Sequence, residues 1–91
     1  MPKLIRIGNY IVFFWSNENN EAIHVHVSRG TISPNSTKIW LTKSGGAVVA
    51  KKSRIPNKDL NEVIDVITDN HAYICKRWKE YFEKSKLKFY C

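Results

Sequence analysis

The stretch Ile23-His24-Val25-His26-Val27 sets the fold class of this 91-residue chain. Apolar residues and histidines alternate in it, which is the period of a β-strand with one face in the core. The three apolar side chains are therefore expected on one face and the two imidazoles on the other. Strand rise separates His24 and His26 by roughly 6.5–7 Å, so both rings could contact one phosphate or one metal ion without a direct hydrogen bond between them.

Two segments before this stretch predict a β-hairpin. Leu4–Ile7 and Tyr10–Trp15 are strand-like, and Gly8-Asn9 between them supplies the positive φ angles that a two-residue turn requires. Tyr10–Trp15 is apolar on both faces. A strand without a polar face is expected inside the sheet, with helices packed over one side.

Further strands are expected after the histidines. Residues 37–42 alternate, Lys43-Ser44-Gly45-Gly46 predicts a hairpin connection, and residues 47–50 return as an apolar strand. Such tight links exclude the long crossovers that parallel pairing needs. We therefore expect an antiparallel meander of four or five strands within about residues 3–52.

The next part of the chain has the spacing of two helices, within about residues 57–84. Pro56-Asn57 predicts the start of the first helix, with Asn57 as its cap. Asp69-Asn70 predicts its end, although one longer, bent helix fits the same pattern. The apolar stripes that would face a core are Leu60, Val63, Ile64 and Ile67 in the first helix, and Ile74, Cys75, Trp78 and Phe82 in the second.

The whole sequence thus predicts a single α+β domain over residues 1–91, an antiparallel sheet followed by two C-terminal helices packed on one face. Its hydrophobic content of 43% suits one modest core. A short basic tail, residues 85–91, alternates weakly at Leu87–Tyr90 and is either frayed or a short edge strand. No apolar run approaches the roughly 20 residues of a membrane helix, no signal peptide is evident, and the two cysteines lack metal or redox spacing, so we expect a cytoplasmic protein.

Charge indicates the class of partner. Fifteen Lys and Arg against eight Asp and Glu give a net charge of +7, which favours polyanions or an acidic protein partner. Trp40 shares a strand face with Lys38 and could be exposed for a base or for a protein. Any single basic run could also be a solvated face. The candidate nucleic-acid-binding residues are Arg29, Lys38, Trp40, Lys43, Lys51, Lys52 and Arg54.

The histidine pair suggests a chemistry. Metal-independent RNA cleavage needs a base for the 2′-hydroxyl, an acid for the leaving oxygen and cations beside the phosphate, and imidazole suits both proton-transfer roles. His24 and His26 are therefore candidate catalytic residues. Arg29 lies on the same strand, but the period of two places it with the apolar residues unless the strand bulges. The alternative is a structural role, in which either histidine hydrogen-bonds a neighbouring strand or caps the polar face of the sheet.

A metal site is not predicted, and neither is a cofactor. Two histidines are a weak metal signal because a site needs a third and usually a fourth ligand. His71 is far along the chain, and Glu18 or Glu21 would have to fold back from their loop.

The order of several short motifs resembles a known family of small bacterial proteins. The motifs are two phenylalanines, the H-V-H-V strand, a glycine turn, I-P-x-x-x-L-x-x-V, an Asn-containing break and a late Trp. Related sequences usually carry a proline before the histidine pair, where this chain has Glu21-Ala22-Ile23. The matching residues are Phe13, Phe14, His24, Val25, His26, Val27, Gly45, Ile55, Pro56, Leu60, Val63, Asn70 and Trp78.

That family is catalogued as a domain of unknown function, and members of it are described as DhiT-like toxins of type II toxin–antitoxin modules, encoded beside a DhiA-like antitoxin. The resemblance implies a toxin that has an acidic antitoxin as its partner. With the charge and the paired imidazoles, it suggests action on RNA or translation, as a possible ribonuclease. Two alternatives stay open: a non-catalytic module that binds nucleic acid or protein, and the partner-binding half of another two-gene complex, with Asp59–Asp69 or the Trp40 face as its interface.

Overall fold

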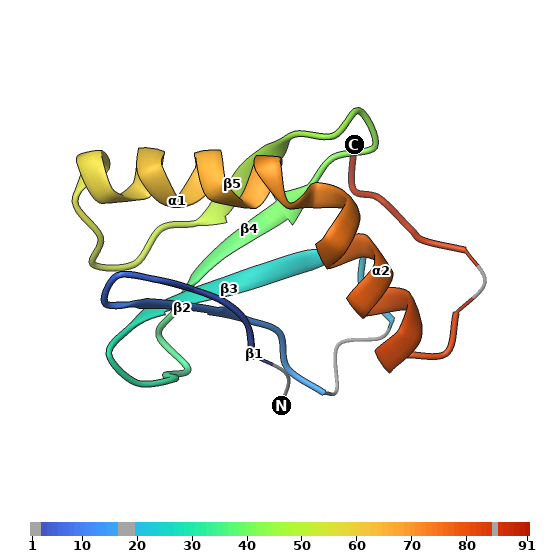
Figure 1. Cartoon of the computed structure of the whole chain (residues 1–91), viewed down its shortest axis with the longest axis horizontal. Coiled ribbons are helices and arrows are strands. Elements are labelled where there is room, and N and C mark those ends of the chain that lie inside the picture. The colour runs from blue at the N-terminus through green and yellow to red at the C-terminus, as the bar shows by residue number, and fades with distance from the viewer. Residues whose placement is uncertain (1–2, 17–19, 85) are drawn as a thin grey trace.

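The computed structural model describes residues 3–16, 20–84 and 86–91. In this part of the chain five antiparallel strands pair in the order β1-β2-β3-β4-β5, and two helices follow them (Figure 1). The predicted α+β meander is confirmed. The elements are β1 (Lys3–Ile7), β2 (Tyr10–Phe13), β3 (His24–Arg29), β4 (Thr37–Leu41), β5 (Ala47–Lys51), α1 (Asn57–Asp69) and α2 (His71–Tyr81).

Both predicted hairpins are present. Gly8 has a φ of 56° in the turn between β1 and β2, and Gly45 has a φ of 98° between β4 and β5. Side chains with a Cβ rarely adopt these angles, so the two glycines fix where the chain reverses. β2 is an interior strand in which all four residues are buried, as its apolar sequence predicts, although it ends at Phe13 rather than at Trp15.

The core lies between the helices and one face of the sheet. In the sheet register Val12 opposes Val27, and Val25 opposes Ile39, so alternate residues of three neighbouring strands share this face. They pack with the apolar stripes of both helices in one cluster. Its fully buried members include Val12, Val25, Ile39, Val63, Ile67 and Ile74. The face of the sheet that bears the histidines is the opposite one, which we call the outer face.

The two helices are separate, with Asn70 between them. The Asn70 side chain donates its Nδ2–H to the Val66 carbonyl at 2.8 Å, and the Asn70 backbone amide donates to the same carbonyl at 3.1 Å. The expected cap at Asn57 is wrong. Asn57 is the first residue of α1, no side chain caps the helix, and its Oδ1 accepts a hydrogen bond from Lys52 Nζ at 2.6 Å instead.

The C-terminal tail is neither frayed nor a strand. The Ile23 amide donates to the Lys88 carbonyl at 2.8 Å, and the Lys43 amide donates to the Cys91 carbonyl at 2.9 Å. Phe89 lies between these bonds and stacks on the His71 ring. The tail is therefore a strap that joins β3 to the β4–β5 turn.

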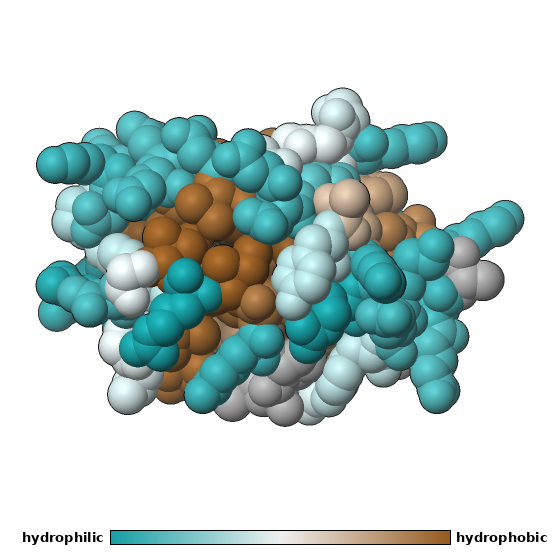
Figure 2. Space-filling model, in the orientation of Figure 1, coloured by the Kyte–Doolittle hydropathy of each residue, from teal (hydrophilic) through white to brown (hydrophobic). Residues whose placement is uncertain are grey.

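The surface seen in Figure 2 has an apolar opening between α1 and the β1–β2 hairpin, surrounded by polar residues. Ile5, Ile7 and Ile64 pack against the core but are only partly buried. None of the described residues forms a helix long and apolar enough to cross a membrane.

Candidate functional site

The two histidines lie side by side on the outer face, as their alternation predicts. Their ring centroids are 5.0 Å apart and the rings are almost perpendicular. His24 is completely buried, with Nδ1 2.8 Å from the Ala22 carbonyl, so Nδ1 carries the proton that it donates. His26 is 8% exposed, and its Nδ1 lies 3.1 Å from the Ser36 hydroxyl. His24 thus hydrogen-bonds the backbone just before its own strand, and His26 hydrogen-bonds the loop before β4.

Both histidines belong to a continuous series of rings, which we call the aromatic row. It begins at Trp15, crosses β2, β3 and β4, and ends on the tail. The sheet register creates it by placing Phe13 opposite His26 and His24 opposite Trp40. Successive ring centroids are 5.2, 5.6, 5.0, 5.3 and 5.0 Å apart along Trp15, Phe13, His26, His24, Trp40 and Tyr90.

Neighbouring elements cover the middle of this row. The Trp78 ring of α2 lies 5.3 Å from His24, and the loop before β4 covers His26 through Ser36. A phosphate has no access to a completely buried imidazole, so this geometry favours the structural role of His24 over a catalytic one. Catalysis by the pair stays a prediction, and the burial of His24 counts against it.

The ends of the row are more accessible, above all at Tyr90, which is 66% exposed. Its ring is nearly parallel to that of Trp40, with an interplanar angle of 7°. Lys38 shares this face with Trp40, as expected, and its Nζ lies 4.4 Å from the centroid of the indole ring. The same Nζ is 2.7 Å from a carboxylate oxygen of Glu21. The accessible end therefore combines two aromatic rings with a cation.

Two adjoining hollows surround this end. We call the first the aromatic hollow; its volume is about 530 Å³. The second, the basic groove, has a volume of about 500 Å³. Lys51 lines both, so they adjoin. The aromatic hollow is lined by Lys38, Trp40, Val48, Val49, Ala50, Lys51 and Tyr90, and the basic groove by Asn35, Lys51, Lys52, Ser53 and Arg54.

The structure thus brings together five of the candidate binding residues, namely Lys38, Trp40, Lys51, Lys52 and Arg54. It does not bring Arg29 or Lys43 to the same place. Arg29 opposes Tyr10 on the helix side of the sheet and lines a separate hollow of about 220 Å³ with Asp59 and Glu62. Lys43 is exposed in the β4–β5 turn. Neither contributes to the lining of the two adjoining hollows, and their role in nucleic-acid binding stays a prediction.

Tyr10 makes a strong contact beside Arg29. Its hydroxyl donates a hydrogen bond to Asp59 Oδ2 at 2.6 Å, which joins β2 to α1. That hydrogen bond raises the pKa of Tyr10 above its usual 10.0, because ionisation would remove the donor, and burial and the negative charge of Asp59 act in the same direction.

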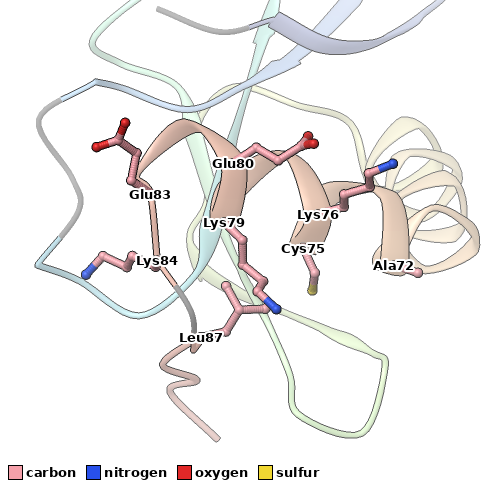
Figure 3. A pocket seen from close by; sticks show the side chains of 8 residues that line it. All are labelled: Ala72, Cys75, Lys76, Lys79, Glu80, Glu83, Lys84 and Leu87. Carbon is pink, nitrogen blue, oxygen red and sulfur yellow. The ribbon is translucent and has the colours of Figure 1, made fainter.

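Sequence reasoning missed Tyr90 as a site residue. Its partner Trp40 is fifty positions earlier in the chain, and no local pattern links the two. A further hollow, of about 770 Å³, was also missed; it lies along α2, where Cys75, Lys79 and Leu87 point toward one another (Figure 3). Burial raises the pKa of the Cys75 thiol, so this cysteine is a poor nucleophile at neutral pH.

The metal alternative finds no geometric support in the described residues, where no three of His, Cys, Asp and Glu are grouped to hold an ion. His71 is engaged elsewhere, since its Nε2 lies 2.8 Å from the Thr42 carbonyl. Glu18, another ligand considered above, lies outside the described residues.

Comparison with known proteins identifies a family. A family model described as a domain of unknown function, DUF4160, matches residues 9–79. The matched segment contains the histidine strand, the basic groove and all but the last two residues of α2. No curated protein and no solved structure matches the chain.

Proposed function

Because the chain belongs to the DUF4160 family, whose function is unknown, we propose its function from its own residues and from the resemblance described above. We propose that it is the toxin of a type II toxin–antitoxin module and that it acts by binding RNA in the basic groove. The toxin role rests on the resemblance. The binding mode rests on one observation: Lys51, Lys52 and Arg54 line one groove that adjoins a hollow bearing exposed aromatic surface.

The chemistry of the groove suits a polyanion. Lysine and arginine side chains contact phosphate oxygens, and a row of them follows the backbone of a nucleic acid. The net charge of +7 adds a long-range attraction that increases the rate of encounter. The proposed partner is an acidic, DhiA-like antitoxin, which the same charge would attract. A cytoplasmic location is also proposed, in keeping with an RNA target.

The non-catalytic binding module of a two-gene complex is the second candidate. The complete burial of His24 favours it over a ribonuclease, since binding at the groove requires no access to the imidazoles. A toxin that blocks its RNA by binding alone agrees with both the resemblance and this burial.

RNA binding can be tested by fluorescence anisotropy at several salt concentrations. The variant K51Q/K52Q/R54Q should bind labelled RNA more weakly, with the slope of log K against log salt reduced by about 2, because each lost contact with a single-strand phosphate contributes about 0.7. The matched control K76Q/K79Q/K84Q removes the same charge from α2 and its C-terminal end. Equal slopes in the two variants would show that only net charge matters, and not the groove.

Toxicity can be tested by inducing the chain alone and following growth and bulk RNA. Growth arrest is expected for the parent, and none for K51Q/K52Q/R54Q at the same soluble level. If the parent chain is well expressed and does not slow growth, the toxin role is wrong. The non-catalytic binding module then takes its place.

The same cultures distinguish RNA cleavage by the chain from RNA binding alone. If the chain cleaves RNA, the parent should degrade bulk RNA, and a folded His24→Ala/His26→Ala variant should bind RNA without degrading it. Arrest with intact RNA in the parent would assign the toxicity to binding.

A further inference from the structure

We infer that the aromatic hollow accepts an unpaired base of single-stranded RNA, which stacks on the ring of Tyr90 while its backbone continues into the basic groove. This inference rests on the proposed RNA binding and adds the structural class of RNA that is selected.

Tyr90 offers an open aromatic face. Its ring lies parallel to Trp40 at a centroid distance of 5.0 Å, so one face is covered by the indole. The side chain is nevertheless 66% exposed, which leaves the other face to solvent. A nucleobase is a planar ring of similar size and stacks well on such a surface, whatever its sequence.

The platform is fixed before any ligand binds. The carbonyls of Lys88 and Cys91, on either side of Tyr90, accept hydrogen bonds from Ile23 and Lys43. Trp40 is also held in place, by the His24 ring at 5.3 Å and by Lys38 Nζ at 4.4 Å. Trp40 is therefore the support of the platform rather than its outer surface. A base that stacks here does not have to order the protein, which preserves more of the stacking free energy for affinity.

The surroundings of the platform suit a nucleotide. The hollow of about 530 Å³ is lined by apolar atoms of Val48 and Ala50 and by the cations Lys38 and Lys51. Lys51 also lines the basic groove. A base in the hollow would thus have its neighbouring phosphates beside Lys51, Lys52 and Arg54. Stacking rings that adjoin a cationic groove are the combination with which proteins hold single strands.

This arrangement selects against duplexes. In a double helix both faces of each internal base are covered by its neighbours in the stack, so a tyrosine ring cannot reach them. The groove can still attract a duplex through its phosphates, without help from Tyr90. The difference between single-strand and duplex affinity therefore measures the platform separately from the charge.

The test compares a fluorescein-labelled single-stranded RNA of about 12 nucleotides with the same strand annealed to its complement. For the single strand, Tyr90→Ala and Tyr90→Leu should reduce the affinity by about 5- to 150-fold, which corresponds to the usual free energy of one base–aromatic stack. Tyr90→Phe should bind as the parent does. The control Tyr73→Ala removes another exposed tyrosine, on α2, and should change nothing. Duplex affinity should be the same in all variants.

The outcomes separate the two proposals. If the parent binds RNA, and Tyr90→Ala and Tyr90→Leu bind the single strand as tightly as the parent does, the stacking role of Tyr90 is refuted and RNA binding stands. Equal losses for single strand and duplex would also refute it. If the parent binds neither RNA, the proposed function fails and this inference fails with it. A variant at Tyr90 that loses a protein partner and keeps its RNA affinity would reassign the hollow to that partner.

Discussion

The alternating sequence pattern around His24 does not reveal that this side chain is buried and packed against other rings. Its ring contacts His26, Trp40 and Trp78, and its Nδ1 bonds to the Ala22 carbonyl. Imidazole is intermediate in burial among side chains, so its place in a strand does not decide whether it is exposed. At this position the neighbouring rings make the side chain part of the folded interior.

Replacing His24 should therefore affect stability first. His24→Ala should lower the free energy of unfolding by about 2–4 kcal/mol, because it leaves a cavity among three aromatic rings and removes one hydrogen bond. Urea unfolding followed by circular dichroism measures this. Lys79→Ala, an exposed position on α2, provides a control with a change within about 0.5 kcal/mol. A His24→Ala protein as stable as its parent would contradict the structural role.

Tyr10 predicts how stability depends on pH. The folded chain raises the pKa of Tyr10, chiefly because the phenol donates a hydrogen bond to Asp59. The folded state therefore prefers the protonated phenol. This stabilisation is fully present below pH 10.0, the ordinary pKa of the group, and it is lost as the pH rises through the folded-state pKa.

Tyr10→Phe tests the same contact. It should cost about 1 kcal/mol at neutral pH, the usual net value of one hydrogen bond. It should also make the loss of stability above pH 10.0 smaller than in the parent. Urea titrations at these pH values measure both effects. If parent and variant lose stability equally at high pH, other groups account for the alkaline transition.

At the scale of elements, local signals predicted most of the architecture. The turn at Gly8-Asn9, the glycine turn before β5 and the break at Asn70 each depend on residues within a few positions, and all three are confirmed. The cap at Asn57 was wrong because its side chain bonds to Lys52, an interaction that depends on how β5 approaches the helix. Local chemistry alone could not reveal that approach.

The candidate site was only partly predictable for the same reason. The strand period correctly placed Lys38 beside Trp40 and both histidines on one face. It could not show what covers that face. The covering groups come from α2 and from the tail, and the contacts from Trp40 to Tyr90 and from Ile23 to Lys88 join residues at least fifty positions apart.

Removing the tail tests its role as a strap. In a chain shortened by residues 86–91, the Ile23 amide loses its acceptor, the Lys88 carbonyl. Hydrogen exchange at this amide should become at least about tenfold faster, while exchange at amides within α1 should change little. Nuclear magnetic resonance can follow both in one sample. Faster exchange throughout α1 as well would show that the tail supports the whole fold and not only this edge.

At the scale of the molecule, the exposed acidic residues of α1 and the basic groove belong to different elements. The acidic residues Glu62 and Asp65 are exposed on α1, which packs over the helix side. The basic groove and the aromatic hollow are lined mainly by residues of β4, of β5 and of the segment that follows β5. At physiological ionic strength the Debye length is about 8 Å, so exposed charges that lie farther apart than this interact weakly.

This separation predicts that the acidic helix has little influence on RNA binding. Glu62→Gln/Asp65→Asn should change the affinity for RNA less than about twofold at physiological salt, because ions screen exposed charges that do not contact the RNA directly. At tenfold lower salt the same variant should bind more tightly than the parent, as the screening length increases. Anisotropy titrations at the two salt concentrations decide this, and a large effect at physiological salt would indicate that RNA also contacts α1.

The strap has a consequence for the order in which the molecule folds. Every strand pairs with its neighbour in the chain, so the sheet can form by a succession of short loop closures, which are fast. The contacts of Tyr90 with Trp40 and of Lys88 with Ile23 close loops of fifty residues or more. We therefore expect the tail to dock after the sheet and helices have formed. During biosynthesis, a nascent chain would complete its groove first and acquire the stacking ring last.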